Sequence, residues 1–190
     1  MEVITKEELR VRKGEIKKRI LKGEIFIYPT DTIYGLGCNG RLQEAVEKIR
    51  ELKGRPKAPF SVIAPSLEWI YKNCEVTKKG EDWLKKLPGP YTLIFKCIDE
   101  KCIANAINPN VNTIGIRVPQ HWFTAVVVKE LGIPIVTTSA NVVGKIAMTS
   151  LDDLDPVIRK GVSFAIYEGP IKGKPSTIVD LTKDAEITER

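Results

Sequence analysis

Short β-prone runs that alternate with helical segments constrain the fold of this chain more than any other feature. Strands are predicted for residues 25–28, 60–64, 91–96, 114–118, 133–138, 162–167 and 177–181. Strands that alternate with helices predict an α/β sheet with helices packed on it. The stretch from Thr92 to Val118 lacks a clear helical pattern, so we expect antiparallel pairing there and a mixed sheet overall.

Two helices have clear boundary signals. Thr5 and Glu8 form a capping box, and the helix that they begin can end at Gly23. Apolar residues recur with a helical period over 45–52, and Gly54 can end that second helix.

Further helices are predicted over 121–131 and over 150–160, the latter capped by Ser150 and Asp153. No internal repeat, low-complexity tract or interdomain linker interrupts the pattern. We therefore expect a single domain over residues 1–190.

The ionisable residues favour a polyanionic ligand without identifying it. The chain has 30 Lys and Arg against 24 Asp and Glu, a formal net charge of +6, which suits ATP phosphates and an RNA backbone equally. Its four cysteines form no CxxC pair, so we expect reduced thiols and no zinc site. The single histidine, His121, stands near a predicted helix start, where packing or capping is its expected role.

No segment indicates export or membrane insertion. The first twenty residues are densely charged, without the apolar centre of a signal peptide. The apolar runs fall far short of the roughly 20 residues that a membrane-spanning helix needs. A cytoplasmic location is expected.

Two phosphate-binding motifs have near matches that fail on context. Gly35, Gly37 and Gly40 fit G-x-G-x-x-G, but six residues separate them from the preceding strand, and the next strand lacks the acidic residue of a dinucleotide site. A Walker-type match around Gly173 and Lys174 fails because proline follows the lysine. An ATP site in this chain must be built differently.

Polar clusters at the ends of predicted strands are the candidate ligand-binding residues. Loops at the ends of sheet strands are where α/β proteins place their ligands. Lysine and arginine neutralise phosphate, arginine also binds carboxylates, and Thr, Ser and Asn add neutral donors and acceptors. The clusters are Thr30-Asp31-Thr32, Lys53-Gly54-Arg55, Arg117 and the run 137–141. Together they predict a binding cleft.

Six ordered motifs resemble the YrdC-like threonylcarbamoyl-AMP synthase family over about residues 9–182. They are PTDTIYGLG at 29–37, KGRP at 53–56, PGPYTLIF at 88–95, GIRVPQH at 115–121, TTSAN at 137–141 and STIVD at 176–180. The resemblance implies a twisted, mixed parallel and antiparallel sheet with flanking helices around a basic concave cleft. It also implies that L-threonine, bicarbonate or carbon dioxide, and ATP react to give threonylcarbamoyl-AMP and pyrophosphate.

The resemblance also implies roles for the polar residues. Lys53 and Arg55 would bind the triphosphate and the carbamate, and Ser139 and Asn141 would contact or orient phosphate oxygens. Thr113 is expected on the nucleotide side. Mg²⁺ would accompany ATP through phosphate oxygens and water, and catalysis would rest on positioning and charge stabilisation.

The same resemblance places the amino acid. Arg117 would pair with the threonine carboxylate, and Thr32, Thr137 and Ser176 would hold the rest of the molecule. Thr30 could replace Thr32 if the loop turns differently. The product would pass to the transferase that modifies tRNA, and weak binding of tRNA or double-stranded RNA would fit the basic charge.

The chain departs from the family pattern at Phe60, where a smaller aliphatic residue is usual, and at Val143, where serine is frequent. Phe60 could alter the packing beneath Arg55. The chain ends soon after STIVDLT, which suggests the short, single-domain type. Two rival functions stay open: a non-catalytic RNA-binding module, and a carbamoyl-adenylate-forming enzyme of the hydrogenase-maturation type.

Overall fold

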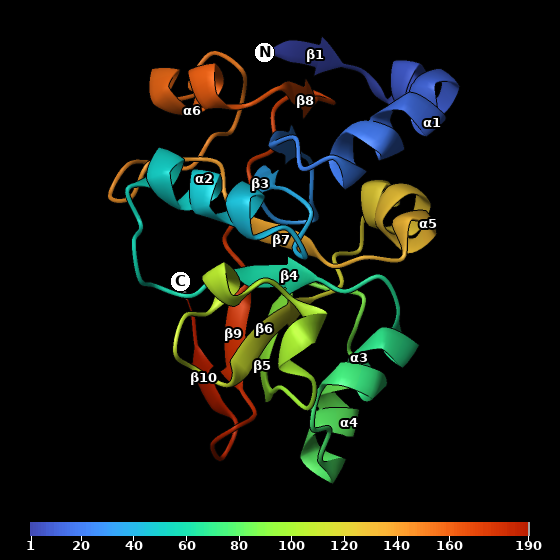
Figure 1. Cartoon of the computed structure of the whole chain (residues 1–190), viewed down its shortest axis with the longest axis vertical. Helices are drawn as coiled ribbons and strands as arrows, with labels where there is room; N and C mark the ends of the chain where they lie inside the picture. The colour runs from blue at the N-terminus through green and yellow to red at the C-terminus, as the bar shows by residue number, and fades with distance from the viewer. Residues whose placement is uncertain (190) are drawn as a thin grey trace.

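A mixed β-sheet forms the centre of the molecule, seen here in a computed structural model that describes residues 1–189. Its spatial order runs from β1 at one edge to β10 at the other (Figure 1). In that order the strands are β1 (Glu2–Ile4), β8 (Phe164–Ile166), β2 (Phe26–Tyr28), β3 (Gly35–Gly37), β7 (Ile135–Ser139), β4 (Ser61–Ile63), β6 (Thr113–Arg117), β5 (Tyr91–Lys96), β9 (Thr177–Asp180) and β10 (Glu186–Thr188).

The sheet mixes both kinds of pairing, as the sequence predicts. Pairs β1–β8, β2–β8, β4–β6 and β5–β9 are parallel. Pairs β2–β3, β3–β7, β4–β7, β5–β6 and β9–β10 are antiparallel. The antiparallel β5–β6 pair confirms the expectation for the stretch from Thr92 to Val118.

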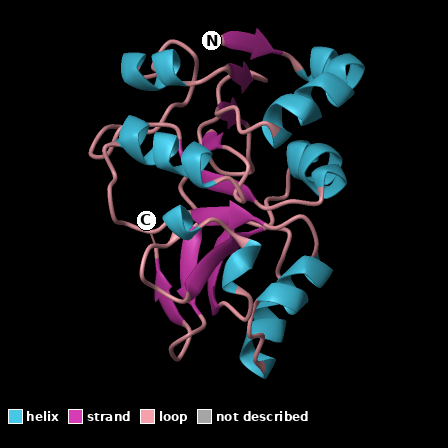
Figure 2. Cartoon of the chain, in the orientation of Figure 1, coloured by secondary structure: helices cyan, strands magenta, loops and turns pink. Residues whose placement is uncertain are grey.

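Helices flank the sheet on both faces (Figure 2). They are α1 (Lys6–Leu21), α2 (Gln43–Lys53), α3 (Leu67–Asn73), α4 (Lys78–Leu84), a π-helical segment η3 (Thr124–Val128) that continues into α5 (Lys129–Leu131), and α6 (Pro156–Gly161). Two short 3₁₀ turns, η1 (Glu100–Cys102) and η2 (Asn105–Ile107), lie between β5 and β6. None of the helices in residues 1–189 is long and apolar enough to cross a membrane.

The predicted caps of the first two helices are present. Thr5 Oγ1 accepts a hydrogen bond from Glu8 N at 3.2 Å, and the Glu8 carboxylate accepts one from Thr5 N at 2.8 Å. Gly23 and Gly54 follow α1 and α2 with φ of +89° and +62°, a left-handed conformation that glycine adopts without a steric penalty. Gly54 therefore turns the chain sharply between Lys53 and Arg55.

The helix predicted over 150–160 begins only at Pro156, so its predicted start is wrong. The Asp153 carboxylate does accept hydrogen bonds from Thr149 N and Ser150 N, but it closes a turn there. Proline disfavours a helical conformation in the residue before it, and Asp155 becomes the N-cap by accepting a hydrogen bond from Val157 N at 2.8 Å.

The loop predicted for 29–40 contains strand β3, which the glycine-rich sequence concealed. A Cβ atom on Gly35 would lie 2.7 Å from Cζ of Tyr28, and one on Gly37 would lie 2.5 Å from the carbonyl oxygen of Val136. The glycines here permit close approach of the strands and of the Tyr28 ring.

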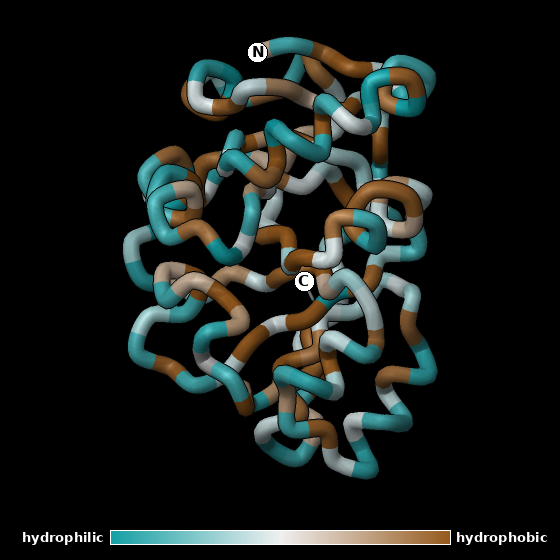
Figure 3. Tube along the Cα trace, turned by 45° about the vertical axis from the view of Figure 1, so that its right-hand side comes forward, coloured by the Kyte–Doolittle hydropathy of each residue, from teal (hydrophilic) through white to brown (hydrophobic). Residues whose placement is uncertain are grey.

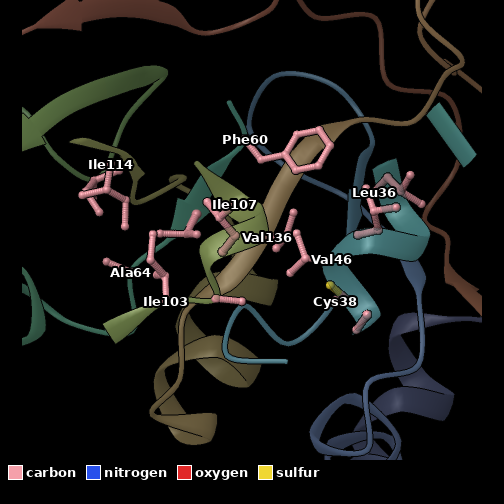
Figure 4. Packing of buried hydrophobic residues seen from close by; sticks show 14 of the residues in the cluster. Leu36, Cys38, Val46, Phe60, Ala64, Ile103, Ile107, Ile114 and Val136 are labelled. Carbon is pink, nitrogen blue, oxygen red and sulfur yellow. The ribbon is translucent and has the colours of Figure 1, made fainter. Parts of the chain in front are cut away.

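Alternating residues of the strands build a core on each face. Phe26 and Tyr28 belong to one cluster of buried side chains, which includes apolar residues of α1 and η3, whereas Ile27 belongs to a second, which includes those of α2. Figure 4 shows part of this second cluster, with Leu36, Val46 and Val136 among its members. Apolar segments run through the middle of the molecule, and polar ones dominate the peripheral turns (Figure 3).

We expect Gly37→Ala to lower the free energy of unfolding by about 1–3 kcal/mol, the usual cost of overpacking a core. Gly14→Ala in α1 is the matched control, because a Cβ atom there meets nothing within 4 Å. Alanine at that helical position should stabilise the protein by roughly 0.5–1 kcal/mol. Urea unfolding measures both, and equal effects of the two substitutions would contradict this packing explanation.

Candidate active site

A cavity of about 500 Å³ lies against strands β3 to β7 and β9. Eight of the nine predicted site residues line it: Thr32, Arg55, Thr113, Arg117, Thr137, Ser139, Asn141 and Ser176. These residues come from sequence positions far apart, and the sheet order brings them together. The ninth, Lys53, does not line the cavity.

Lys53 lies beneath the turn that follows β7. Its side chain is 2% exposed, and its Nζ donates to the carbonyl oxygens of Ser139 at 2.6 Å and Asn141 at 2.8 Å. A third hydrogen bond, at 3.1 Å, goes to Oδ1 of Asn141. In this conformation the ammonium group therefore holds the backbone of the turn.

Burial, together with a smaller effect of the nearby positive charge of Arg55, lowers the pKa of Lys53 to about 8. The three oxygen acceptors favour the charged form. An ammonium group with this pKa carries its charge at neutral pH and can lose it only slightly above.

Ser139 and Asn141 present their side chains on this turn. Ser139 Oγ donates to Asn141 Oδ1 at 2.5 Å, and Asn141 Nδ2 donates to the carbonyl oxygen of Lys145 at 2.5 Å. Val143 N donates to the carbonyl oxygen of Lys53 at 2.9 Å, which closes the turn onto the end of α2. These hydrogen bonds hold the turn through both its side chains and its backbone.

Arg55 reaches the cavity from the loop after α2. Its guanidinium donates to the carbonyl oxygen of Pro59 at 2.7 Å and lies 5.2 Å from the centre of the Phe60 ring. The expected influence of Phe60 on packing at Arg55 is therefore visible as a cation–π contact. Burial lowers the pKa of Arg55, and the charge of Arg50 does so as well.

Arg117 ends β6 and is only 6% exposed. Its guanidinium donates to Asp31 Oδ1 at 3.0 Å and to Thr32 Oγ1 at 3.2 Å. Burial lowers its pKa, although the Asp31 charge opposes that shift. Its Nε is a buried donor that has no hydrogen-bond partner among the described residues.

Hydroxyl groups line the same cavity as this arginine, and Thr32 rather than Thr30 is one of the lining residues. Thr30 Oγ1 is occupied by the turn itself, because it donates to the carbonyl oxygen of Ile33 at 2.7 Å. Ser176 Oγ and Thr92 Oγ1 are 2.8 Å apart in a buried hydrogen bond. Thr137, which is 6% exposed, also lines the cavity.

Sequence reasoning missed two residues that line the cavity, Thr92 and Asn108, and the pairing of a third. Asp31 belongs to a predicted polar cluster, but its ion pair with Arg117 was not predicted, and Thr92 is the partner of Ser176. Asn108 lines the cavity near Thr113, whose backbone and hydroxyl oxygens both accept from its amide nitrogen. Asp31 and Thr92 lie inside quoted motifs, whereas nothing in the sequence distinguishes Asn108.

The loop from β8 to β9 forms the last wall. Tyr34 OH donates to the carbonyl oxygen of Gly169 at 2.6 Å and anchors the start of the loop. A Cβ atom on Gly173 would lie 1.7 Å from the carbonyl oxygen of Thr32, so only glycine fits at this crossing. Pro175 and Ser176 then face the cavity.

His121 lies outside this cavity. Its Nδ1 accepts from Phe123 N at 3.3 Å at the start of the helical segment, and its Nε2 lies 2.9 Å from Oε1 of Glu168. Because Nδ1 accepts, Nε2 carries the proton in the neutral ring and donates to the carboxylate. These contacts agree with a capping and packing role.

The fold and the site define an α/β protein with a cationic, hydroxyl-lined cavity where several strands end. The family model Sua5_yciO_yrdC, described as "Telomere recombination", matches residues 18–190. The chain belongs to this Sua5/YrdC family.

Relatives and solved structures agree with this assignment. A Methanocaldococcus jannaschii protein with the provisional name threonylcarbamoyl-AMP synthase is 35% identical, over 98% of this chain and 88% of its own. A Histophilus somni protein named threonylcarbamoyl-AMP synthase is 31% identical, over 88% of this chain and 93% of its own. The crystal structure of P. abyssi Sua5 complexed with L-threonine superposes with a TM-score of 0.81 at 30% identity; the match covers 96% of this chain but 54% of that one.

The low pKa of Lys53 predicts a pH-dependent stability. Between pH 8 and its ordinary value of 10.5, the unfolded chain binds more protons at this lysine than the folded one, so stability rises with pH in that window. Relative to Lys53→Met, the wild type should therefore gain up to about 3 kcal/mol as the pH rises from 7.5 to 10.5. Urea unfolding of both proteins measures the difference, and a difference that does not change with pH would contradict the shift.

Proposed function

We propose that this chain is a threonylcarbamoyl-AMP synthase, which condenses L-threonine, bicarbonate or carbon dioxide, and ATP. One observation carries the proposal most directly: a single cavity joins Arg117 to the cluster of Arg55, Ser139 and Asn141. The first suits a carboxylate and the second suits phosphate oxygens. The names of the relatives and the threonine complex of P. abyssi Sua5 support the same activity.

The amino-acid half of the reaction begins at Arg117. The threonine carboxylate would accept hydrogen bonds from the Arg117 guanidinium, and the hydroxyl groups of Thr32, Thr137 and Ser176 would hold the remaining polar atoms of threonine. The threonine amine and bicarbonate form a carbamate and release water. This end of the cavity therefore orients the carbamate toward ATP.

The nucleotide half of the reaction needs no protein nucleophile. A carbamate oxygen attacks the α-phosphorus of ATP, the bond to the β-phosphate oxygen breaks, and pyrophosphate leaves. Arg55 and Ser139 would stabilise the charge that develops on the phosphate oxygens, and Thr113 would contact the nucleotide. Lys53 would act by fixing the turn of Ser139 and Asn141, with its positive charge directly behind that turn.

Mg²⁺ would enter as the counter-ion of ATP. The described lining residues include no carboxylate, and residues 1–189 contain no cluster of three or more potential His, Cys, Asp or Glu ligands. The donor set thus suits a cation that is held by phosphate oxygens and water. When bound, Mg²⁺ would neutralise part of the phosphate charge.

The product is a mixed anhydride that an amine can attack. A transferase that modifies adenosine in tRNA would consume it, and a cytoplasmic location would place both proteins in the compartment where this product forms. The net charge of +6 would allow weak binding of the tRNA backbone in addition.

The decisive experiment is pyrophosphate release from ATP with bicarbonate and Mg²⁺, with and without L-threonine, in RNA-free protein. We expect release that depends on threonine. Release with carbamoyl phosphate in place of threonine and bicarbonate would favour the carbamoyl-adenylate reaction instead. A folded protein that releases no pyrophosphate but binds double-stranded RNA would favour the RNA-binding module.

Lys53→Ala and Ser139→Ala should each reduce the threonine-dependent rate about 100-fold or more, the usual effect of losing a preorganised charge or donor. Lys48→Ala, an exposed lysine on the same helix as Lys53, is the control and should leave the rate within twofold of the wild type. Circular dichroism confirms folding. Wild-type rates in folded Lys53→Ala and Ser139→Ala proteins would remove these residues from the mechanism.

A further inference from the structure

Arg50 is a buried cation without an anionic partner. It lies on α2, one helical turn before Lys53, and is 7% exposed. Among the described side chains, no carboxylate forms an ion pair with its guanidinium. Burying a charge without a counter-ion is unfavourable for the free energy of folding, so other interactions of Arg50 must compensate for it.

Backbone carbonyl groups of two loops surround this guanidinium. Nε donates to Ala106 at 2.6 Å, and Nη2 donates to Ile107 at 3.2 Å. Nη1 donates to Arg55 at 2.8 Å and to Ala58 at 3.1 Å. The planar fork of arginine thus joins the loop after α2 to the 3₁₀ turn η2, a connection that the single ammonium of lysine cannot reproduce.

Each of these loops brings a residue to the cavity. The first carries Arg55 itself, and the second leads directly into Asn108. Asn108 Nδ2 donates to the backbone oxygen of Thr113, which can only accept, so Asn108 Oδ1 is fixed on the opposite side of the amide. Among the described residues that buried oxygen has no partner.

Phe60 connects the two loops, and the guanidinium groups of Arg50 and Arg55 both pack against its ring. The guanidinium carbons of Arg50 and Arg55 are 4.6 Å and 5.2 Å from the ring centre. Phe60 N donates to the carbonyl oxygen of Ile107 at 2.9 Å, and both residues belong to the core cluster in Figure 4. Two like charges this near one ring repel each other, and an anion in the cavity would offset that repulsion.

We infer that Arg50 is a positioning residue of the phosphate-binding half of the site. It fixes the two loops that present Arg55 and Asn108, and its charge, placed behind Phe60, attracts the phosphate groups that bind beside Arg55. The role of Arg50 in ATP binding rests on the proposed function. Its role in binding a phosphate-containing anion requires only that the cavity binds pyrophosphate.

The test measures pyrophosphate and L-threonine affinities by calorimetry at low and high salt. The proteins are the wild type, Arg50→Met, Arg50→Lys and the control Lys48→Met, which changes an exposed lysine of the same helix. Arg50→Met should weaken pyrophosphate binding at least tenfold and reduce its salt dependence, because one attracting charge is gone. Arg50→Lys should weaken it at least threefold, and Lys48→Met less than twofold. Threonine affinity should stay within twofold throughout.

Three results would overturn the inference: no pyrophosphate binding by the wild type, wild-type affinity in Arg50→Met, or an equal loss of threonine and pyrophosphate affinity. If Arg50→Met does not fold, Arg50→Lys decides by the same threefold criterion. A wild type that binds pyrophosphate but shows no threonine-dependent release from ATP would count against the proposed reaction alone. The assignment of Arg50 would then stand on the binding data.

Discussion

The buried ammonium of Lys53 is the interaction on which the site depends. It joins the end of α2 to the turn after β7, two segments more than eighty residues apart in sequence. Removing a charge from water is unfavourable, and three oxygen acceptors offset that cost only if the turn keeps one conformation. Lys53 therefore fixes the positions of Ser139 and Asn141, although it does not itself line the cavity.

Three cations contribute positive charge to one region of the cavity, one at its surface and two behind it. Arg55 lines it, Lys53 lies behind one turn, and Arg50 lies behind an aromatic ring. Arg117, which also lines the cavity, forms an ion pair with Asp31. One region of the cavity therefore holds an excess of positive charge, and the other holds a charge that is already paired and finely oriented. This asymmetry matches a reaction between a highly charged nucleotide and a small amino acid.

Local signals predicted much of the fold, and the ordered motifs contain most of the polar residues that line the cavity. The Thr5 capping box, the Gly54 terminator and the β5 run follow from near-neighbour chemistry, which the sequence displays directly. β3 escaped prediction because its glycines serve a contact with Tyr28 and Val136 that only the folded sheet creates. The role of Arg50 escaped for a similar reason: on an amphipathic helix an arginine suggests a solvated face, and its true partners are backbone atoms of distant loops.

The loop from β8 to β9 has a consequence for how the site comes into being. It carries the chain from one part of the sheet to the other, across Thr32, and delivers Ser176 beside Thr92. These partners are separated by 84 residues in one case and by more than 140 in the other, and closing such long segments costs chain entropy before any contact repays it. The part of the cavity formed by Thr32, Thr92 and Ser176 should therefore be among the last parts of the molecule to form during folding. A chain would then become able to bind its ligand only when nearly all of its sheet is in register.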